Sequence, residues 1–225
     1  MATVKVVDVL SRAQTLLKDS TGVRWSLTEL QLWLNDGYRD TLILRPDANT
    51  LVGEFTCVAG PRQKITSTFS NASRLIECVR NTATSSNKSR VRLASRQSVD
   101  SMRPNWYAET PTVNIELYVF DPRTPTEFLV YPPASTAARL EVTYAQVPTP
   151  HTLTDVQLAN PATAEVIRID DMFAGALLDY VLYRAYSKDA EDAAVSSRAV
   201  AHYQAFVAAL GAKGQSEAAS QPGVA

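Results

Sequence analysis

The sequence predicts an α+β fold in which helices from both ends of the chain enclose a β module. Near both ends, apolar residues recur every three to four positions, which is the period of an amphipathic helix. Between residues 49 and 147 the pattern changes to short alternating runs separated by Gly, Pro, Asn and Asp. We therefore expect a four-helix bundle of two N-terminal and two C-terminal helices, an inserted antiparallel β-sandwich or barrel, and an extended C-terminal tail.

The first helix is expected over residues 5–18. Its apolar side chains form one stripe at helical spacing, at Val6, Leu10, Ala13 and Leu17. Gly22 follows, and a glycine just beyond a helix suits the left-handed conformation that ends it. We therefore expect a left-handed stop at Gly22.

Residues 26–45 could form a hairpin or a helix, because Asn35-Asp36-Gly37 is a turn signal inside a helical spacing of apolar residues. Ser26 and Glu29 have the spacing of a capping box, in which each side chain satisfies the other residue's backbone donor. Pro46 then removes the helical option after Arg45. A helix is therefore favoured. Gly37 costs ~1 kcal/mol relative to Ala inside a helix, which predicts that a neighbouring element packs tightly there.

Seven short strands are expected between the helical pairs. Their runs are rich in Thr and Val and alternate in polarity, which is typical of a small sandwich or barrel. They cover residues 51–58, 63–69, 74–81, 90–95, 112–120, 127–133 and 138–147.

Two further helices are expected over residues 167–192 and 193–211, the second ending at Gly211. The first of these is apolar almost all round, since only Asp179 and Arg184 interrupt residues 172–186. It should be the central helix of the bundle, or its second face should meet another subunit. An unpaired buried charge is very costly, so Arg184 is expected to pair with Asp36 or Asp40 of the second helix.

These patterns divide the chain into four parts. Residues 1–48 and 151–211 are expected to form two helical half-domains around an inserted β module at 49–150. Residues 212–225 contain too few large apolar groups to offset the entropy of ordering. We expect this tail to be extended or mobile unless a partner holds it.

Composition limits the classes of partner. The 22 basic and 23 acidic residues give a net charge of -1, so contact with nucleic acid or an anionic membrane must be local. Nothing at the N-terminus resembles a signal peptide, and the longest apolar stretch is shorter than the ~20 residues of a membrane span. These features predict a soluble protein of a reducing compartment, in which Cys57 and Cys78 are buried thiols and not a disulfide.

The sequence contains little that indicates catalysis or a cofactor. His151 and His202 are too few for a histidine metal site, and no Cys-x-x-Cys accompanies them. No P-loop, G-x-S-x-G or G-x-G-x-x-G occurs. The clustered acids fall at predicted helix ends, where capping explains them better than a glycosidase pair does. We expect no enzyme activity, no cofactor and no metal.

One segment is locally basic. Residues 87–103 contain Lys88, Arg90, Arg92, Arg96 and Arg103 against a single acid, Asp100. On a strand, Lys88, Arg90 and Arg92 would share one face. This face is either simply solvated or a patch that contacts DNA phosphates or an acidic partner without reading sequence.

An ordered set of packing motifs gives the clearest indication of function. The helix capped by Ser26, with Trp25 just before it, leads to "RPDA", and Arg96, Asp100, Pro104 and Trp106 follow. "FLVYPP" then precedes "LEVTYAQVP", and "ALLDYVLYRAYSKDAE" precedes "RAVAHYQAF". Together, over residues 5–211, they resemble the head-to-tail adaptor, or connector, proteins of short-tailed bacteriophages.

The resemblance implies a structural virion protein at the head–tail junction, assembled in the host cytoplasm. Identical subunits, twelve by the family's pattern, would form a ring that docks beneath the portal and receives the tail nozzle or tube. Double-stranded DNA would pass through the lumen during ejection. Adaptor-like proteins tend to reach the portal or a neighbouring subunit with a C-terminal extension, which here would use Lys213, Gln215 and Val224.

A different class also explains part of the sequence. A virion surface or carbohydrate-binding module would use the β insertion, with Trp106, Tyr107 and Tyr118 as a stacking platform. Trp106 behind Pro104 is better explained as a packing anchor. This alternative also leaves the four helices unexplained.

Overall fold

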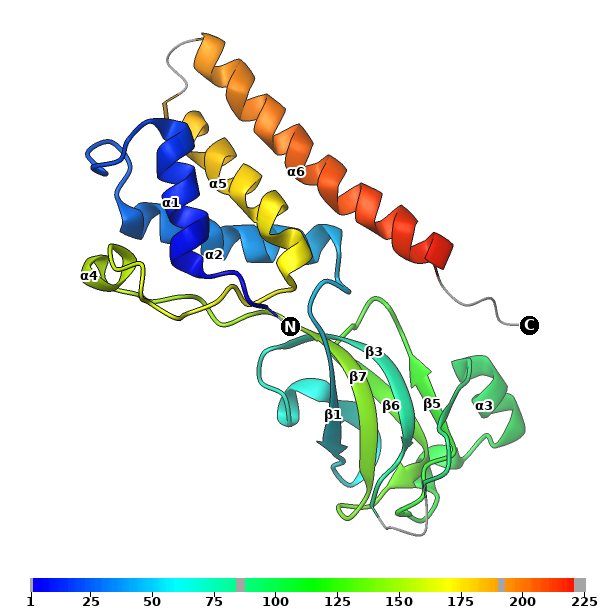
Figure 1. The fold of residues 1–225 in the computed structure, drawn as a ribbon. Coiled ribbons are helices and arrows are strands. Elements are labelled where there is room, and N and C mark those ends of the chain that lie inside the picture. The colour runs from blue at the N-terminus through cyan, green and yellow to red at the C-terminus, as the bar shows by residue number, and fades with distance from the viewer. Residues whose placement is uncertain (1, 84–87, 190–192, 221–225) are drawn as a thin grey trace. The chain divides into compact units, whose positions relative to one another are not determined.

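The computed structural model describes residues 2–83, 88–189 and 193–220, and the fold is α+β (Figure 1). The chain divides into two compact units. Residues 1–48 and 148–225 form a helical unit, and residues 49–147 form a β unit. The side chains of residues 193–194 and 212–220 are not described.

In the helical unit, α1 spans Val6–Leu17, and its expected apolar stripe is buried. The helix ends at Leu17, one residue before the predicted end, and Lys18 adopts the left-handed conformation itself with φ 55°. Gly22 also has a positive φ, of 66°, but it lies in the following loop. The expected left-handed stop is thus made by Lys18 and not by the glycine.

Helix α2 spans Leu27–Leu44, so the helix and not the hairpin forms at Asn35-Asp36-Gly37. The Ser26 side chain accepts a hydrogen bond from the backbone N–H of Glu29, as predicted. The predicted reciprocal hydrogen bond, from the backbone N–H of Ser26 to the Glu29 side chain, does not form. The Glu29 carboxylate instead accepts from Lys188 Nζ at 2.8 Å, because an ion pair with α5 is available to it.

The remaining helices of this unit are α4 (Asp155–Leu158), the 3-10 turn η3 (Asp171–Phe173), α5 (Ala174–Lys188) and α6 (Ala193–Ser220). Helix α5 is central, since α1, α2 and α6 all contact it. Gly37 lies at the approach of α2 to α5: a Cβ there would be 3.1 Å from Tyr180 Cδ1. Figure 1 shows α2 crossing α1 and α5, so a regular four-helix bundle is not confirmed.

The predicted ion pair of Arg184 with Asp36 or Asp40 does not form. Asp36 pairs with Arg39 at 2.9 Å, and the Asp40 carboxylate accepts a hydrogen bond from Tyr180. Arg184 is only half-buried. A half-buried arginine can keep its guanidinium in water while its stem covers apolar surface, so a carboxylate partner is not required.

The prediction of an extended tail over residues 212–225 is also wrong for the described part of that segment, because α6 continues through Gly211 to Ser220. Apart from its chain neighbours and the backbone of α6, no described atom lies within 4 Å of the position that a Cβ on Gly211 would take. Glycine tolerates a helix at a cost of about 1 kcal/mol, and the Ala, Lys, Gln and Glu residues that follow are good helix formers. Val224 lies outside the described residues.

The β unit contains two sheets around one core. The first has the order β1-β7-β3 and the second β2-β6-β5-β4. Phe55 of β1 and Phe128 of β6 are both buried, with ring centroids 5.5 Å apart, so the sheets pack face to face as a sandwich. The strands are β1 (Thr50–Thr56), β2 (Gly60–Lys64), β3 (Ala72–Asn81), β4 (Arg92–Leu93), β5 (Leu117–Phe120), β6 (Glu127–Ala134) and β7 (Arg139–Gln146).

In the described part of the β unit, seven strands thus form near the seven predicted runs, but the runs at 63–69 and 90–95 contain only two strand residues each, and the run at 112–120 forms a strand only from Leu117. The run at 63–69 is largely the 3-10 turn η1 (Ile65–Ser67), because β2 ends at Lys64. The run at 90–95 shrinks to β4, which pairs parallel to β5 and not antiparallel. Helix α3 (Arg96–Met102) and the turn η2 (Trp106–Ala108) follow it and were not predicted.

The two cysteines are free thiols inside the sandwich core, as predicted. Burial raises the pKa of Cys57 to about 12 and that of Cys78 well above its usual value. Both therefore stay protonated and behave as small apolar side chains.

The two helical glycines should respond oppositely to substitution. Gly37→Val inserts carbon against Tyr180 and Leu177, so the free energy of unfolding should fall by about 1 to 3 kcal/mol. Gly211→Ala adds a methyl group in open space and should raise it by up to about 1 kcal/mol. Urea unfolding of both variants measures this. A neutral Gly37→Val would show that the α2–α5 approach is not close.

Candidate functional site

The most elaborate polar cluster lies between α2 and the segment that returns from the β unit. The His151 side chain is fully buried, and both of its ring nitrogens are bonded. Nδ1 lies 2.5 Å from Glu165 Oε1, and Nε2 lies 2.9 Å from the Tyr38 hydroxyl. The Tyr38 oxygen also accepts the backbone N–H of Arg168 at 3.3 Å, and the Arg168 guanidinium donates to Glu165 at 2.8 Å.

The protonation states follow from burial. Burial raises the pKa of Tyr38, so its hydroxyl keeps the proton and donates it to Nε2. Burial also lowers the pKa of His151, with the hydrogen bond to Glu165 acting in the opposite direction. The hydrogen bond from His151 holds the pKa of Glu165 below its usual value. A neutral His151 that donates from Nδ1 to a carboxylate satisfies every group.

Two buried amides on α2 hold the same segment through its backbone. Asn35 donates to the carbonyl of His151 at 3.0 Å and accepts its N–H at 2.8 Å. Gln31, one turn earlier, makes the same reciprocal pair with Leu153, at 3.2 and 2.9 Å. Because residues 151 and 153 point the same way in an extended chain, the two amides act as a neighbouring strand would.

This carboxylate–imidazole–hydroxyl chain has the composition of a catalytic relay, but it is buried in the core, where it serves a structural role. Tyr38 and His151 are 1% and 2% exposed, so the core covers the hydroxyl that a substrate would have to reach. The cluster, which we call the His151 latch (Gln31, Asn35, Tyr38, His151, Glu165 and Arg168), fixes the return segment on α2. The sequence analysis missed it, although two amides four residues apart on the buried face of a helix were a readable signal.

His202 lies at the edge of the core, as predicted. Its Nδ1 is 2.9 Å from Asp179 of α5, its ring stacks on Tyr186, and its side chain is 30% exposed. Within residues 2–83, 88–189 and 193–220, no three His, Cys, Asp or Glu side chains are grouped to hold a metal ion. His202 therefore serves α5–α6 packing.

The predicted basic residues Lys88, Arg90, Arg92 and Arg96 are all exposed, but they do not form one strand face. Only Arg92 lies in β4, while Arg96 begins α3. Arg90 and Arg92 flank the buried Val91 and so share a side. Arg90 lies 3.9 Å from Glu77 and Arg96 3.5 Å from Asp100, which partly neutralises them. Such exposed pairs contribute little to stability.

Arg96 also borders a cavity of about 570 Å³ in the β unit, which the sequence did not predict. Arg62 and Arg123 line it too, and each has a carboxylate partner in its wall, Glu127 and Asp121 respectively. Arg123 lowers the pKa of Asp121 to about 2. The paired charges leave this cavity without a strong preference for an anion.

The carbohydrate-binding alternative is not supported by the geometry of its aromatic residues. Trp106 is 0% exposed, and its indole N–H donates to Asp100 at 2.8 Å. Tyr118 is 5% exposed, inside the sandwich core. Only Tyr107 is exposed, and it stacks on Trp106. Trp106 is therefore a packing anchor, and the expected stacking platform does not exist.

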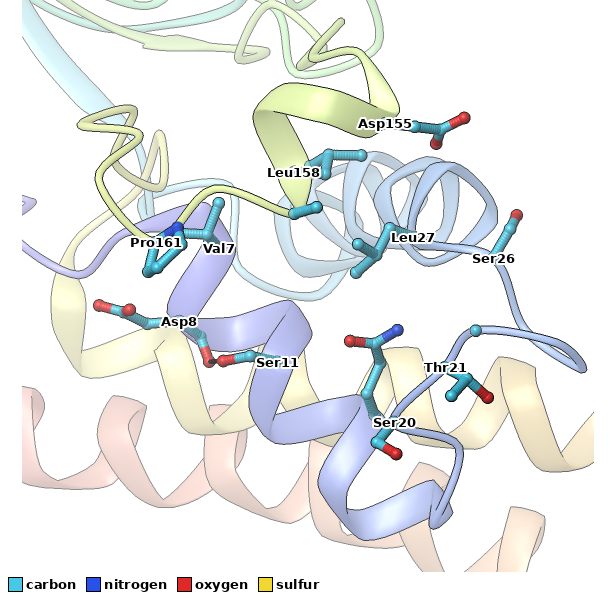
Figure 2. A pocket seen from close by; sticks show the side chains of 13 residues that line it. Val7, Asp8, Ser11, Ser20, Thr21, Ser26, Leu27, Asp155, Leu158 and Pro161 are labelled. Carbon is cyan, nitrogen blue, oxygen red and sulfur yellow. Dashed lines mark hydrogen bonds between the residues drawn. The ribbon is translucent and has the colours of Figure 1, made fainter.

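The helical unit carries a groove of about 540 Å³ between α1 and α4, which we call the α1–α4 groove. Figure 2 shows the side chains of Asp8 and Asp155 projecting from α1 and α4, the two walls. Val7, Leu27 and Leu158 give it apolar surface, and its hydroxyls come from Ser11, Ser20, Thr21 and Ser26. Its lining contains two carboxylates and no cation.

The His151 latch should make folding stability depend on pH. The folded state favours neutral His151, so the unfolded chain binds an extra proton as pH falls through about 6.5, and stability is lost there. His151→Gln should cost about 1 to 3 kcal/mol at pH 8 and less at pH 5.5. Urea unfolding of both proteins between pH 5.5 and 8 measures this. A difference in unfolding free energy between the two proteins that stays constant across that pH range would contradict this prediction.

One protein family matches nearly the entire chain. The family model for the SU10 adaptor protein matches residues 4–225. No curated protein matches the chain. Among the described residues, no helix is both long and apolar enough to cross a membrane. The match confirms the resemblance to bacteriophage adaptors that the ordered motifs indicated.

Proposed function

We propose, from the premise that the chain belongs to the SU10 adaptor protein family, that it forms a ring between the portal and the tail. The family is one of bacteriophage adaptor proteins, so the chain has a structural role in the virion. Copies of the chain, twelve in our proposal, dock beneath the portal and receive the tail nozzle or tube. DNA passes through the lumen during ejection. Assembly takes place in the host cytoplasm.

The match over residues 4–225 is the observation that carries this proposal. The geometry of the described residues is compatible with it, because the His151 latch and the His202–Asp179 pair hold elements of the helical unit together. The Tyr38 hydroxyl is buried, and His202 packs against Asp179 and Tyr186. A protein of this kind acts through its surfaces.

Two segments are proposed as contact sites. Lys88, Arg90, Arg92 and Arg96 are exposed and would meet DNA phosphates in the lumen or an acidic partner, without sequence readout. The C-terminal end of the chain would meet the portal or a neighbouring subunit. Lys213 and Gln215 lie in the last turns of α6, and Val224 follows the described residues.

Mass measurement of the full-length protein tests the ring directly. Native mass spectrometry should give a single closed oligomer of about twelve chains, either for the protein alone or after addition of the portal protein. The portal is included because ring contacts that are weak in solution gain from a shared template. A chain that stays monomeric at every concentration, even on the portal, would refute the proposed function.

The basic contact has its own test. Lys88→Gln, Arg90→Gln and Arg92→Gln together should leave unfolding unchanged, since all three side chains are exposed. They should weaken DNA retention or docking, most strongly at low salt, because screening reduces the contribution of these charges as salt rises.

The matched control removes three exposed cations elsewhere, with Arg12→Gln, Lys18→Gln and Lys64→Gln. It should behave as the wild type. Equal effects of the two triple variants would mean that only net charge matters and that the Lys88–Arg92 face has no contact of its own.

A further inference from the structure

Helix α6 carries apolar surface that its own subunit does not cover. Its inner face packs on α5 through Ala199, Phe206 and Leu210, which are at most 5% exposed. On its outer side Val200 is 52% exposed and Val207 39%. Figure 1 shows α6 as the outermost helix of this unit, with α5 between it and α1.

The outer face of α6 also lacks the charges of a solvated helix. Residues 199–212 include no Lys, Arg, Asp or Glu, and the exposed polar side chains described among them are Tyr203 and Gln204. Helices that face water normally present charged residues there, and a helix that is apolar all round is normally buried. Helix α5 has that character and is enclosed. The same pattern in α6 indicates that a further surface covers it.

The charges of α6 indicate what that surface is. Among residues 195–211 of α6, whose side chains are described, the one Lys, Arg, Asp or Glu is the exposed Arg198. The α1–α4 groove, on the other side of α5, has the opposite character: Asp8 and Asp155, no lining cation, and an apolar base that includes Val7 and Leu27. The first surface is mostly apolar and carries one cation, Arg198, and the second is a groove of mixed apolar and hydroxyl lining that carries two carboxylates.

We propose that the outer face of α6 of one copy packs into the α1–α4 groove of the next copy. This inference rests on the proposed ring, and it names the pair of surfaces that closes it. The two surfaces are different patches on different sides of α5, so the contact is head-to-tail. Contacts of this type generate closed rings, whereas a patch that binds itself gives only dimers. Ala201, Ala205 and Ala208 allow the helix to approach the groove closely.

The apolar half of the contact is tested with Val200→Glu. The side chain is half exposed, so the variant should fold and melt like the wild type, but it would bury a carboxylate beside Asp8 and Asp155. Ring formation, measured by native mass spectrometry under the conditions that assemble the wild type, should need at least about tenfold more protein. Leu93→Glu, at a 65% exposed position of β4, is the matched control and should assemble normally.

The charged half is tested by exchange. Asp8→Lys and Arg198→Glu should each weaken the ring by about tenfold, because each places like charges across the contact. The double variant restores the opposite charges in reversed order and should recover most of the wild-type assembly. Asp8 and Arg198 are both exposed, so all three proteins should fold.

The outcomes separate this inference from the proposed function. If the wild type never forms a ring, the proposed function fails and the inference with it. If the wild type forms a ring and Val200→Glu or the single charge variants do so equally well, the contact lies elsewhere and only the inference is overturned. The same holds if the double charge variant assembles no better than the single ones.

Discussion

Burial of α5 on every side is the constraint on which the helical unit depends. Leu177, Val181 and Leu182 are at most 1% exposed, and each large apolar side chain contributes about 1.5 to 3 kcal/mol when buried. No single neighbour can cover such a helix. Helices α1 and α2 from one end of the chain and α6 from the other must therefore assemble around it, which makes residues 49–147 an insertion whose two ends return to the same helical core.

That topology explains why a polar cluster is buried here at all. The returning segment has no sheet to join, yet its backbone donors and acceptors must be satisfied where it crosses α2. Gln31 and Asn35 supply the missing partners, and Tyr38 with Glu165 occupies both nitrogens of His151. A partly satisfied cluster would cost more than an apolar one. The latch therefore works as a unit, and its chemical resemblance to a relay reflects geometry required for packing.

The sequence predicted those parts of the fold that depend on local pattern. Helical spacing located α1, α2, α5 and the start of α6, and the tight packing expected at Gly37 is confirmed by Tyr180 and Leu177. The predictions were wrong where contacts between distant parts of the chain determine the local structure. Glu29 accepts a hydrogen bond from Lys188 and does not complete the capping box. Arg184 is half-buried and forms no ion pair with Asp36 or Asp40. Helix α6 continues through Gly211. Among the candidate site residues, exposure of the basic group could be predicted, whereas the α1–α4 groove joins segments too distant for any local signal.

Adaptors face a physical conflict between remaining soluble as single chains and binding tightly once assembled. A charged outer helix would favour solubility but oppose burial, and a leucine-rich one would aggregate before the right partner arrived. The outer face of α6 is intermediate, since its alanines and two valines expose modest apolar area and, in the proposed contact, its one described charge, Arg198, would meet the carboxylate of Asp8. Each contact is then weak alone. In the proposed closed ring every subunit would gain two of them, so specificity would come from closure and not from the strength of one interface.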